Sequence, residues 1–69
     1  MKISARNQIP GKVVEVTKGA TTAHVKINIA GGTIITASIT NEAVDKLQLK
    51  TGSAATVIIK ASDGMVGVS

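Results

Sequence analysis

The chain has 69 residues, a net charge of +4, and no Cys, Phe, Tyr or Trp. A chain below about 70–80 residues rarely gains more than about 3–5 kcal/mol from one core, and usually adds disulfides, a metal or partner subunits. The lack of cysteine excludes disulfides, and the lone His24 argues against a structural zinc site. We therefore expect a single domain, residues 1–69, that buries its apolar surface against further copies of itself.

The positive charge favours anionic partners, which include nucleic acid, an acidic membrane surface and small anions. No apolar run approaches the roughly 20 residues that a membrane-spanning helix needs, and the N-terminus lacks the apolar core of a signal peptide. These features predict a cytoplasmic protein without a membrane partner.

The first half of the chain has the period-two pattern of β-strands. Residues 12–18 predict a strand that continues from the N-terminal residues through a bend or bulge at Pro10 and Gly11. A turn at Gly19 and Ala20 closes it. Residues 21–29 then alternate apolar and polar side chains without a break, which predicts a half-buried second strand.

A glycine pair separates the second strand from a third. Gly31 and Gly32 are expected to form a hairpin turn, because both residues can adopt positive φ without penalty. Residues 33–39 predict the third strand, and since its second face still carries Ile34, we expect that face to be covered as well.

The period then changes to that of a helix. Residues 40–47 place acidic residues early and a lysine late, with Thr40 or Asn41 as N-cap, which predicts one helix of about two turns. Leu49 and Gly52 follow its end.

Two further strands are predicted beyond the helix, over residues 55–60 and 65–68, with a turn at Asp63 and Gly64 between them. Five strands with a short helix between the third and fourth is the order of the OB fold, so the fold class is all-β, a small five-stranded OB-type barrel. An SH3-like barrel is the main alternative, and it would place a one-turn helix nearer the end of the chain.

The titratable residues do not suggest an enzyme. His24 lies in an alternating strand with no carboxylate nearby to orient it, and the four acidic residues are scattered. No nucleophile, base and orienting group are spaced so that the predicted fold would bring them together. His24 is interpreted as an exposed or interface residue.

Nucleic-acid binding is the alternative function that an OB-type barrel suggests. Single-strand binders of this fold stack bases on aromatic side chains along a basic groove. This chain has no aromatic residue, and its basic residues are dispersed over every strand. We therefore expect no nucleic-acid partner.

A cluster of hydrogen-bond donors stands at the start of the chain. Residues 4–8, Ser-Ala-Arg-Asn-Gln, combine a hydroxyl, the only arginine and two amides with no carboxylate. Arginine stays charged at any working pH and presents a planar set of five N–H donors, which suits an oxyanion. The simpler interpretation is a solvated strand with an ordinary surface arginine.

Two further donor sets fit an anion site. Lys60 and Ser62 fall at the end of the fourth predicted strand, where they are expected to project the same way, and the start of the helix at residues 40–43 supplies backbone N–H groups. Each has a simpler interpretation, as a solvent-facing lysine or a helix cap. Together they favour a donor-only pocket, which suits a dianion that carries no proton.

The sequence resembles the molbindins, the small stand-alone Mop proteins, over essentially its whole length. The resemblance is carried by Ser-Ala-Arg-Asn-Gln at 4–8, Gly11, Ala-Gly-Gly at 30–32, Ile-Thr at 39–40 and Ile-Lys-Ala-Ser at 59–62. Similar modules occur in the molybdate-responsive transcription regulator and in the ATPase of the molybdate importer. The resemblance implies cytoplasmic binding of molybdate or tungstate by an OB-type barrel that assembles as a hexamer, a trimer of dimers, with the oxyanions between subunits.

The resemblance also implies which residues form the principal oxyanion site. One subunit would supply Ser4, Ala5, Arg6, Lys60 and Ser62, and its neighbour would supply Thr40 and the backbone N–H near Ala43. Regulators of the family have a serine where this chain has Ala43, so only a main-chain contact is inferred there.

A second type of site in the family lies on the threefold axis and uses the turn after the first strand. In this chain the corresponding residues are Gly19, Thr21 and Thr22. Lys18 and Lys26 would add positive electrostatic potential that favours the oxyanion, without being ligands.

The expected function is therefore oxyanion binding, with molybdenum or tungsten held only as molybdate or tungstate and no metal ion bound directly. Because the 69 residues contain no DNA-binding or ATPase segment, a role in intracellular storage and molybdenum homeostasis is expected instead of regulation. The alternatives are a nucleic-acid-binding OB module and a structural oligomerisation module whose anion site is incidental.

Overall fold

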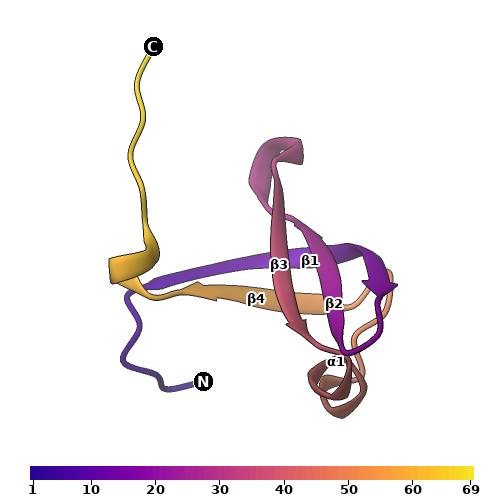
Figure 1. Ribbon diagram of the computed structural model, residues 1–69. Helices are drawn as coiled ribbons and strands as arrows, with labels where there is room; N and C mark the ends of the chain where they lie inside the picture. The colour runs from indigo at the N-terminus through magenta and orange to yellow at the C-terminus, as the bar shows by residue number, and fades with distance from the viewer.

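A computed structural model describes all 69 residues of the chain. Four strands form one antiparallel sheet in the order β3-β2-β1-β4, with β1 at Asn7–Lys18, β2 at Thr22–Asn28, β3 at Ile34–Thr40 and β4 at Ala54–Ile59. The helix α1 (Asn41–Leu47) joins β3 to β4, and two short 3₁₀ turns, η1 (Ala30–Gly32) and η2 (Ala61–Asp63), complete the elements. The sheet curls, so that β2 and β3 cross the direction of β1 and β4 (Figure 1).

The long strand β1 makes the sheet curl because its two halves pair with different partners. Residues 7–12 pair with β4, and the second half, from Lys12 onward, pairs with β2. The register with β2 shifts between Val13 and Glu15, so Val14 forms a β-bulge. Val13, before the bulge, lies in the core, and Val16, after the bulge, packs against the core. In a regular strand, two residues three positions apart would face opposite sides. The bulge thus keeps both valines on the inner face.

The expected bulge at Pro10 and Gly11 is therefore wrong, since both residues lie in regular register with β4. Val13 N–H donates to the carbonyl of Ser53 (2.9 Å), and because bonded and non-bonded pairs alternate along an antiparallel ladder, Pro10 occupies a non-bonded position. Its missing N–H removes no ladder bond. Gly11 is required by a close approach instead, because a Cβ there would lie 2.6 Å from the carbonyl oxygen of Asn28.

Strand β2 confirms the predicted alternation, with every second side chain buried between exposed neighbours. The buried core consists of six residues, Val13, Ala23, Val25, Ile27, Val44 and Val57. All are aliphatic and none is larger than isoleucine, so one chain alone encloses little apolar surface. Ile34, which we expected to be covered, is 46% exposed in the single chain.

The glycine turn and the helix follow the sequence closely. Gly31 and Gly32 both adopt positive φ, at 72° and 80°, but within the short turn η1 and not a two-residue hairpin. The helix α1 begins after Thr40, whose Oγ1 accepts a hydrogen bond from Ala43 N–H, as predicted for an N-cap. Gln48 ends it in the left-handed conformation, with φ at 55°.

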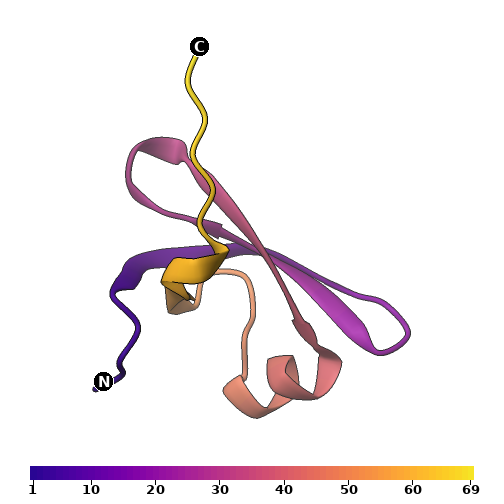
Figure 2. The same ribbon diagram turned by 60° about the vertical axis from the view of Figure 1, so that its left-hand side comes forward.

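The fifth predicted strand does not form. Residues 65–69 continue from η2 as an extended tail that points away from the sheet in both views (Figures 1 and 2). Met65, Val66 and Val68 are each 96% exposed. No partner strand lies beside them in the same chain, which is why the periodicity of this segment did not translate into a strand.

The fold class nevertheless agrees with the prediction: a mostly β, curled half-barrel with one short helix between the third and fourth strands. Leu47 is 65% exposed and lies beside an apolar hollow whose lining includes Leu49 and Ile58. No helix of this structure has the length and apolar character that crossing a bilayer requires.

Candidate functional site

The residues of the N-terminal motif lie together with Lys60 at one end of the sheet. Asn7 and Ile59 are the last pair of the β1–β4 ladder, so the chain on either side leaves the sheet at the same point. A hollow of about 370 Å³ forms there, lined by Ile3, Ser4, Ala5, Arg6, Lys60 and Ala61. Four of the seven residues expected in the principal oxyanion site therefore share one surface depression.

Electrostatics favour an anion in this hollow. Arg6 and Lys60 come from segments 54 positions apart in sequence, and neither forms an ion pair with a carboxylate. Two unpaired cations beside one another repel, and an anion placed between them relieves that repulsion. The hydroxyl of Ser4 adds a neutral donor to the same lining.

Ser62 does not line this hollow. Strand β4 ends at Ile59, and residues 61–63 form the 3₁₀ turn η2, closed by a hydrogen bond from Asp63 N–H to the Lys60 carbonyl (2.9 Å). The strand alternation that predicted a shared direction for Lys60 and Ser62 therefore does not apply. Ser62 lies one residue beyond the lining residue Ala61, in exposed chain.

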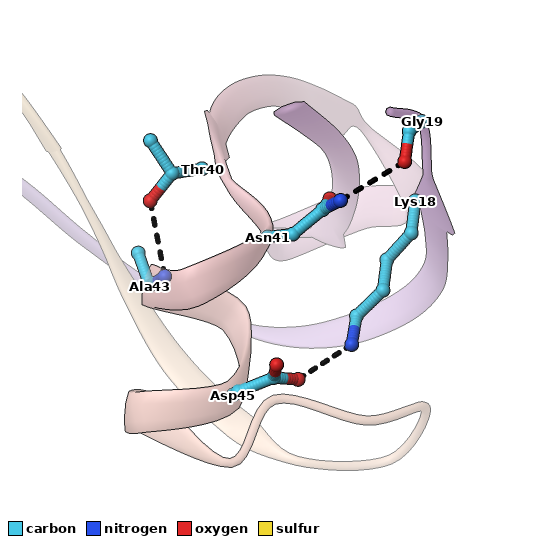
Figure 3. A network of polar contacts seen from close by, with 6 residues as sticks. All are labelled: Lys18, Gly19, Thr40, Asn41, Ala43 and Asp45. Carbon is cyan, nitrogen blue, oxygen red and sulfur yellow. Dashed lines mark hydrogen bonds and ion pairs between the residues drawn. The ribbon is translucent and has the colours of Figure 1, made fainter. Parts of the chain in front are cut away.

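Thr40 and Ala43 lie elsewhere in the chain, at the start of α1. Ala43 N–H donates to Thr40 Oγ1 (3.0 Å), so this backbone group is already used by the helix cap (Figure 3). The Thr40 hydroxyl accepts that bond and keeps its own proton free to donate. Of the two, Thr40 is thus the direct candidate donor.

The two groups of predicted site residues do not meet within one chain. The hollow lies where β4 ends, whereas α1 lies beyond the opposite end of β4 (Figure 1). A strand of about five to six residues spans roughly 17–20 Å, so a tetrahedral anion cannot contact both ends at once. Any site that contains both groups must take them from different copies.

The turn between β1 and β2 holds the residues expected in the second site. Gly19 N–H donates to the Thr22 carbonyl (2.7 Å), and Asn41 donates twice to the same turn, from its backbone N–H to Thr21 O and from Nδ2 to Gly19 O, each at 2.9 Å. Figure 3 shows the side-chain bond. Gly19, Thr21 and Thr22 thus lie together, and all three are exposed.

The two lysines expected to add positive potential are both paired. Lys18 Nζ contacts the carboxylate of Asp45 on α1 (Figure 3), and Lys26 Nζ lies 3.6 Å from Glu15 Oε2. Their charge is therefore largely balanced locally. An anion at the β1–β2 turn would therefore meet N–H and hydroxyl donors and no unpaired lysine from this pair.

Sequence reasoning assigned no role to Asn41 beyond a possible helix cap. The structure shows it half-buried, with its side chain joining α1 to the β1–β2 turn. The signal that could have found it is an amide side chain placed directly after the cap residue Thr40, in the first turn of the helix. His24 is exposed and pairs with Thr17 and Ser38, which assigns it no site.

The fold and the site define a class of protein: a small OB-type domain that presents clustered cationic and hydroxyl donors at the end of its sheet. The chain matches the TOBE domain over residues 3–66, and it belongs to the molbindin, or Mop, family. It is 48% identical over 68 residues to a probable molybdenum-pterin-binding protein of Haemophilus influenzae, covering 99% of both chains.

Solved structures agree with this membership. MopII from Clostridium pasteurianum aligns over 97% of this chain and 100% of its own, with a TM-score of 0.92 and 45% identity. The molybdate-bound structure of the cytoplasmic molybdate-binding protein ModG aligns over all of this chain with a TM-score of 0.95 and 43% identity. This chain spans 49% of the ModG chain.

Proposed function

We propose that this protein binds molybdate or tungstate as the intact tetrahedral oxyanion, at sites shared between copies of itself, and serves as a cytoplasmic store. The observation that carries the proposal is the hollow in which Ser4, Ala5 and Arg6 lie beside Lys60, with neither cation paired. The relatives support it, because one is named for molybdenum-pterin binding and another holds molybdate.

The chemistry of the hollow supports a free oxyanion as the ligand. Its polar side chains are one guanidinium, one ammonium and one hydroxyl. Such a set donates hydrogen bonds to an anion without protons and offers little to a ligand that must itself donate. The chain also has no aromatic side chain on which a pterin ring could stack.

The sharing of sites between copies follows from the position of Thr40. One chain cannot bring Thr40 and Ala43 to the hollow, so a second copy would contribute them, with Ser62 closing the site from the η2 side. Only six residues are buried in the single chain, and residues 65–69 stay exposed, so much apolar surface remains for subunit contacts. A hexamer built as a trimer of dimers would meet this need.

Calorimetric titration with molybdate, tungstate, sulfate and phosphate tests the ligand. We expect the highest affinity for molybdate and tungstate, a lower affinity for sulfate, and the lowest for phosphate, because phosphate keeps a proton that needs an acceptor. Equal affinity for all four anions, or none for molybdate and tungstate, would contradict the proposal.

The storage role needs a count of bound ions. Native mass spectrometry with and without molybdate reports the number of subunits and of ligands together. We expect a homo-oligomer that is filled to about one ion per subunit or more. A monomer, or saturation far below one ion per subunit, would exclude storage between subunits.

A further inference from the structure

We propose that Asn41 is a positioning residue that holds the β1–β2 turn in the conformation needed to bind a second oxyanion, a role that rests on the proposed function. Asn41 is not itself a ligand. It acts by fixing the direction of the peptide groups between Gly19 and Thr22.

The first step concerns the hydrogen bond that would normally close this turn. In a two-residue hairpin, the N–H of the residue after the turn donates to the carbonyl of the residue before it. Here that bond would join Thr22 N–H to Gly19 O, and it is absent. The Gly19 carbonyl instead accepts from Asn41 Nδ2 at 2.9 Å.

The second step concerns the direction of the N–H groups. All peptide bonds of the chain are trans, so each carbonyl and the following N–H point in opposite directions. Because the Gly19 and Thr21 carbonyls both point toward Asn41, the N–H groups of Ala20 and Thr22 point away from it. The Asn41 side chain thereby directs the Ala20 N–H away from α1, and the Asn41 backbone N–H does the same for the Thr22 N–H.

The third step concerns what the turn presents to solvent. The carbonyls of Gly19, Thr21 and Thr22 all accept hydrogen bonds within the chain, from Asn41 or from Gly19 N–H. No backbone carbonyl accepts from Ala20 or Thr21 N–H, and the two threonine hydroxyls are exposed. Three of the four carbonyls from Gly19 to Thr22 are therefore occupied within the chain, and only that of Ala20 accepts no hydrogen bond. The turn thus exposes more donors than free carbonyls, which suits a proton-free anion.

The orientation of the Asn41 amide is fixed by its surroundings. Only the amide nitrogen can donate to the Gly19 carbonyl, and Oδ1 is buried without a partner. The reversed amide orientation would place Oδ1 against the Gly19 carbonyl, where two acceptors repel, so Nδ2 faces the turn. A residue needed only to start the helix would not require this arrangement.

The experiment follows the backbone amides of the turn by NMR in the full-length oligomer as molybdate is added. In the parent protein we expect shifts at Ala20, Thr21 and Thr22, separate from shifts around Arg6. The Asn41→Ala variant should weaken the affinity of the turn by roughly 2- to 12-fold, the net effect of losing one hydrogen bond between neutral groups, and leave the response around Arg6 unchanged.

The matched control is Asn7→Ala, which removes another asparagine whose Nδ2 donates to a backbone carbonyl, that of Ile59 (3.2 Å). Its effect should be confined to the hollow, with the turn amides responding as in the parent. Should Asn41→Ala not fold, Asn41→Ser tests the same point, because serine is accepted in the first turn of a helix but is too short to reach Gly19.

Unchanged turn affinity in a folded Asn41 variant would overturn the proposal. So would a parent protein whose amides shift around Arg6 but not at the turn, and in that case the proposed function would stand without this inference. A parent that binds no molybdate at all would end both.

Discussion

Asn7 pairs with Ile59 at the end of the β1–β4 ladder, and its side-chain amide donates to the Ile59 carbonyl as well. This doubled contact fixes the point at which both strands leave the sheet. Arg6 and Lys60 follow directly on either side, so two unpaired cations are held at one hollow. The stability of the ladder thus offsets a repulsion that a bound anion would remove.

Replacing Arg6 should weaken oxyanion binding strongly. Arg6→Ala removes a charged donor, worth about 1.5–3 kcal/mol for each hydrogen bond to a charged group, or roughly 10- to 150-fold in Kd. Arg6→Lys keeps the charge but loses the planar pair of donors, so its affinity should lie between that of the parent protein and that of Arg6→Ala. Calorimetry with molybdate measures the series. If Arg6→Ala bound as tightly as the parent, the assignment of the hollow would be wrong.

Replacing Gly11 should destabilise the fold. The Cβ of Gly11→Ala would lie 2.6 Å from Asn28 O and 2.8 Å from Ile27 Cγ2, so β1 or β2 must move, at a cost of about 1–3 kcal/mol. Gly64→Ala is the control, because its Cβ would make only an ordinary contact of 3.4 Å. Urea unfolding followed by far-UV circular dichroism suits a chain without aromatic residues. Equal stability of both variants would contradict the close approach.

Local patterns predicted most of the fold because each is decided by near neighbours. The alternation of residues 21–29 gave β2, and Thr40 gave the helix start with its cap. The bulge was misplaced, because adjacent valines at 13 and 14 signal a register shift only when the partner strand is known. The strand predicted over residues 65–68 was wrong for the same reason, since a period of two does not show whether a partner strand exists in the same chain.

The site was predictable in kind but not in geometry. The donor motif at residues 4–8 could be identified from its composition, yet its proximity to Lys60 depends on the β1–β4 register. Which lysines are unpaired depends on tertiary structure, as the contacts of Lys18 with Asp45 and of Lys26 with Glu15 illustrate. The contacts of Asn41 could not be predicted from local sequence, because its partners Gly19 and Thr21 lie about 20 residues away.

Two substitutions of Thr40 should separate its function as helix cap from its proposed hydrogen bond to the oxyanion. Thr40→Ala removes both the cap and the hydroxyl donor, and should lower the free energy of unfolding by about 1 kcal/mol. Thr40→Asp caps the helix well but places a negative charge beside the proposed oxyanion, so it should keep the stability of the parent and lose affinity. Thermal unfolding and calorimetry give the two readouts. Parent-like molybdate affinity in Thr40→Asp would remove Thr40 from the site.

Placing carboxylates in the extended tail, residues 65–69, should dissociate the oligomer. Met65, Val66 and Val68 are exposed in one chain, and apolar side chains in a continuous exposed segment are typical of subunit contacts. The double variant Val66→Asp with Val68→Asp would bury two unpaired carboxylates in such a contact, so native mass spectrometry should detect smaller species. Because Thr40 would then no longer reach the hollow of a neighbouring copy, molybdate affinity should fall in parallel. Val66→Ile, which stays apolar, should keep the parent mass. A charged variant with the parent's mass and affinity would show that the tail lies outside the subunit contacts, and the shared site would need another explanation.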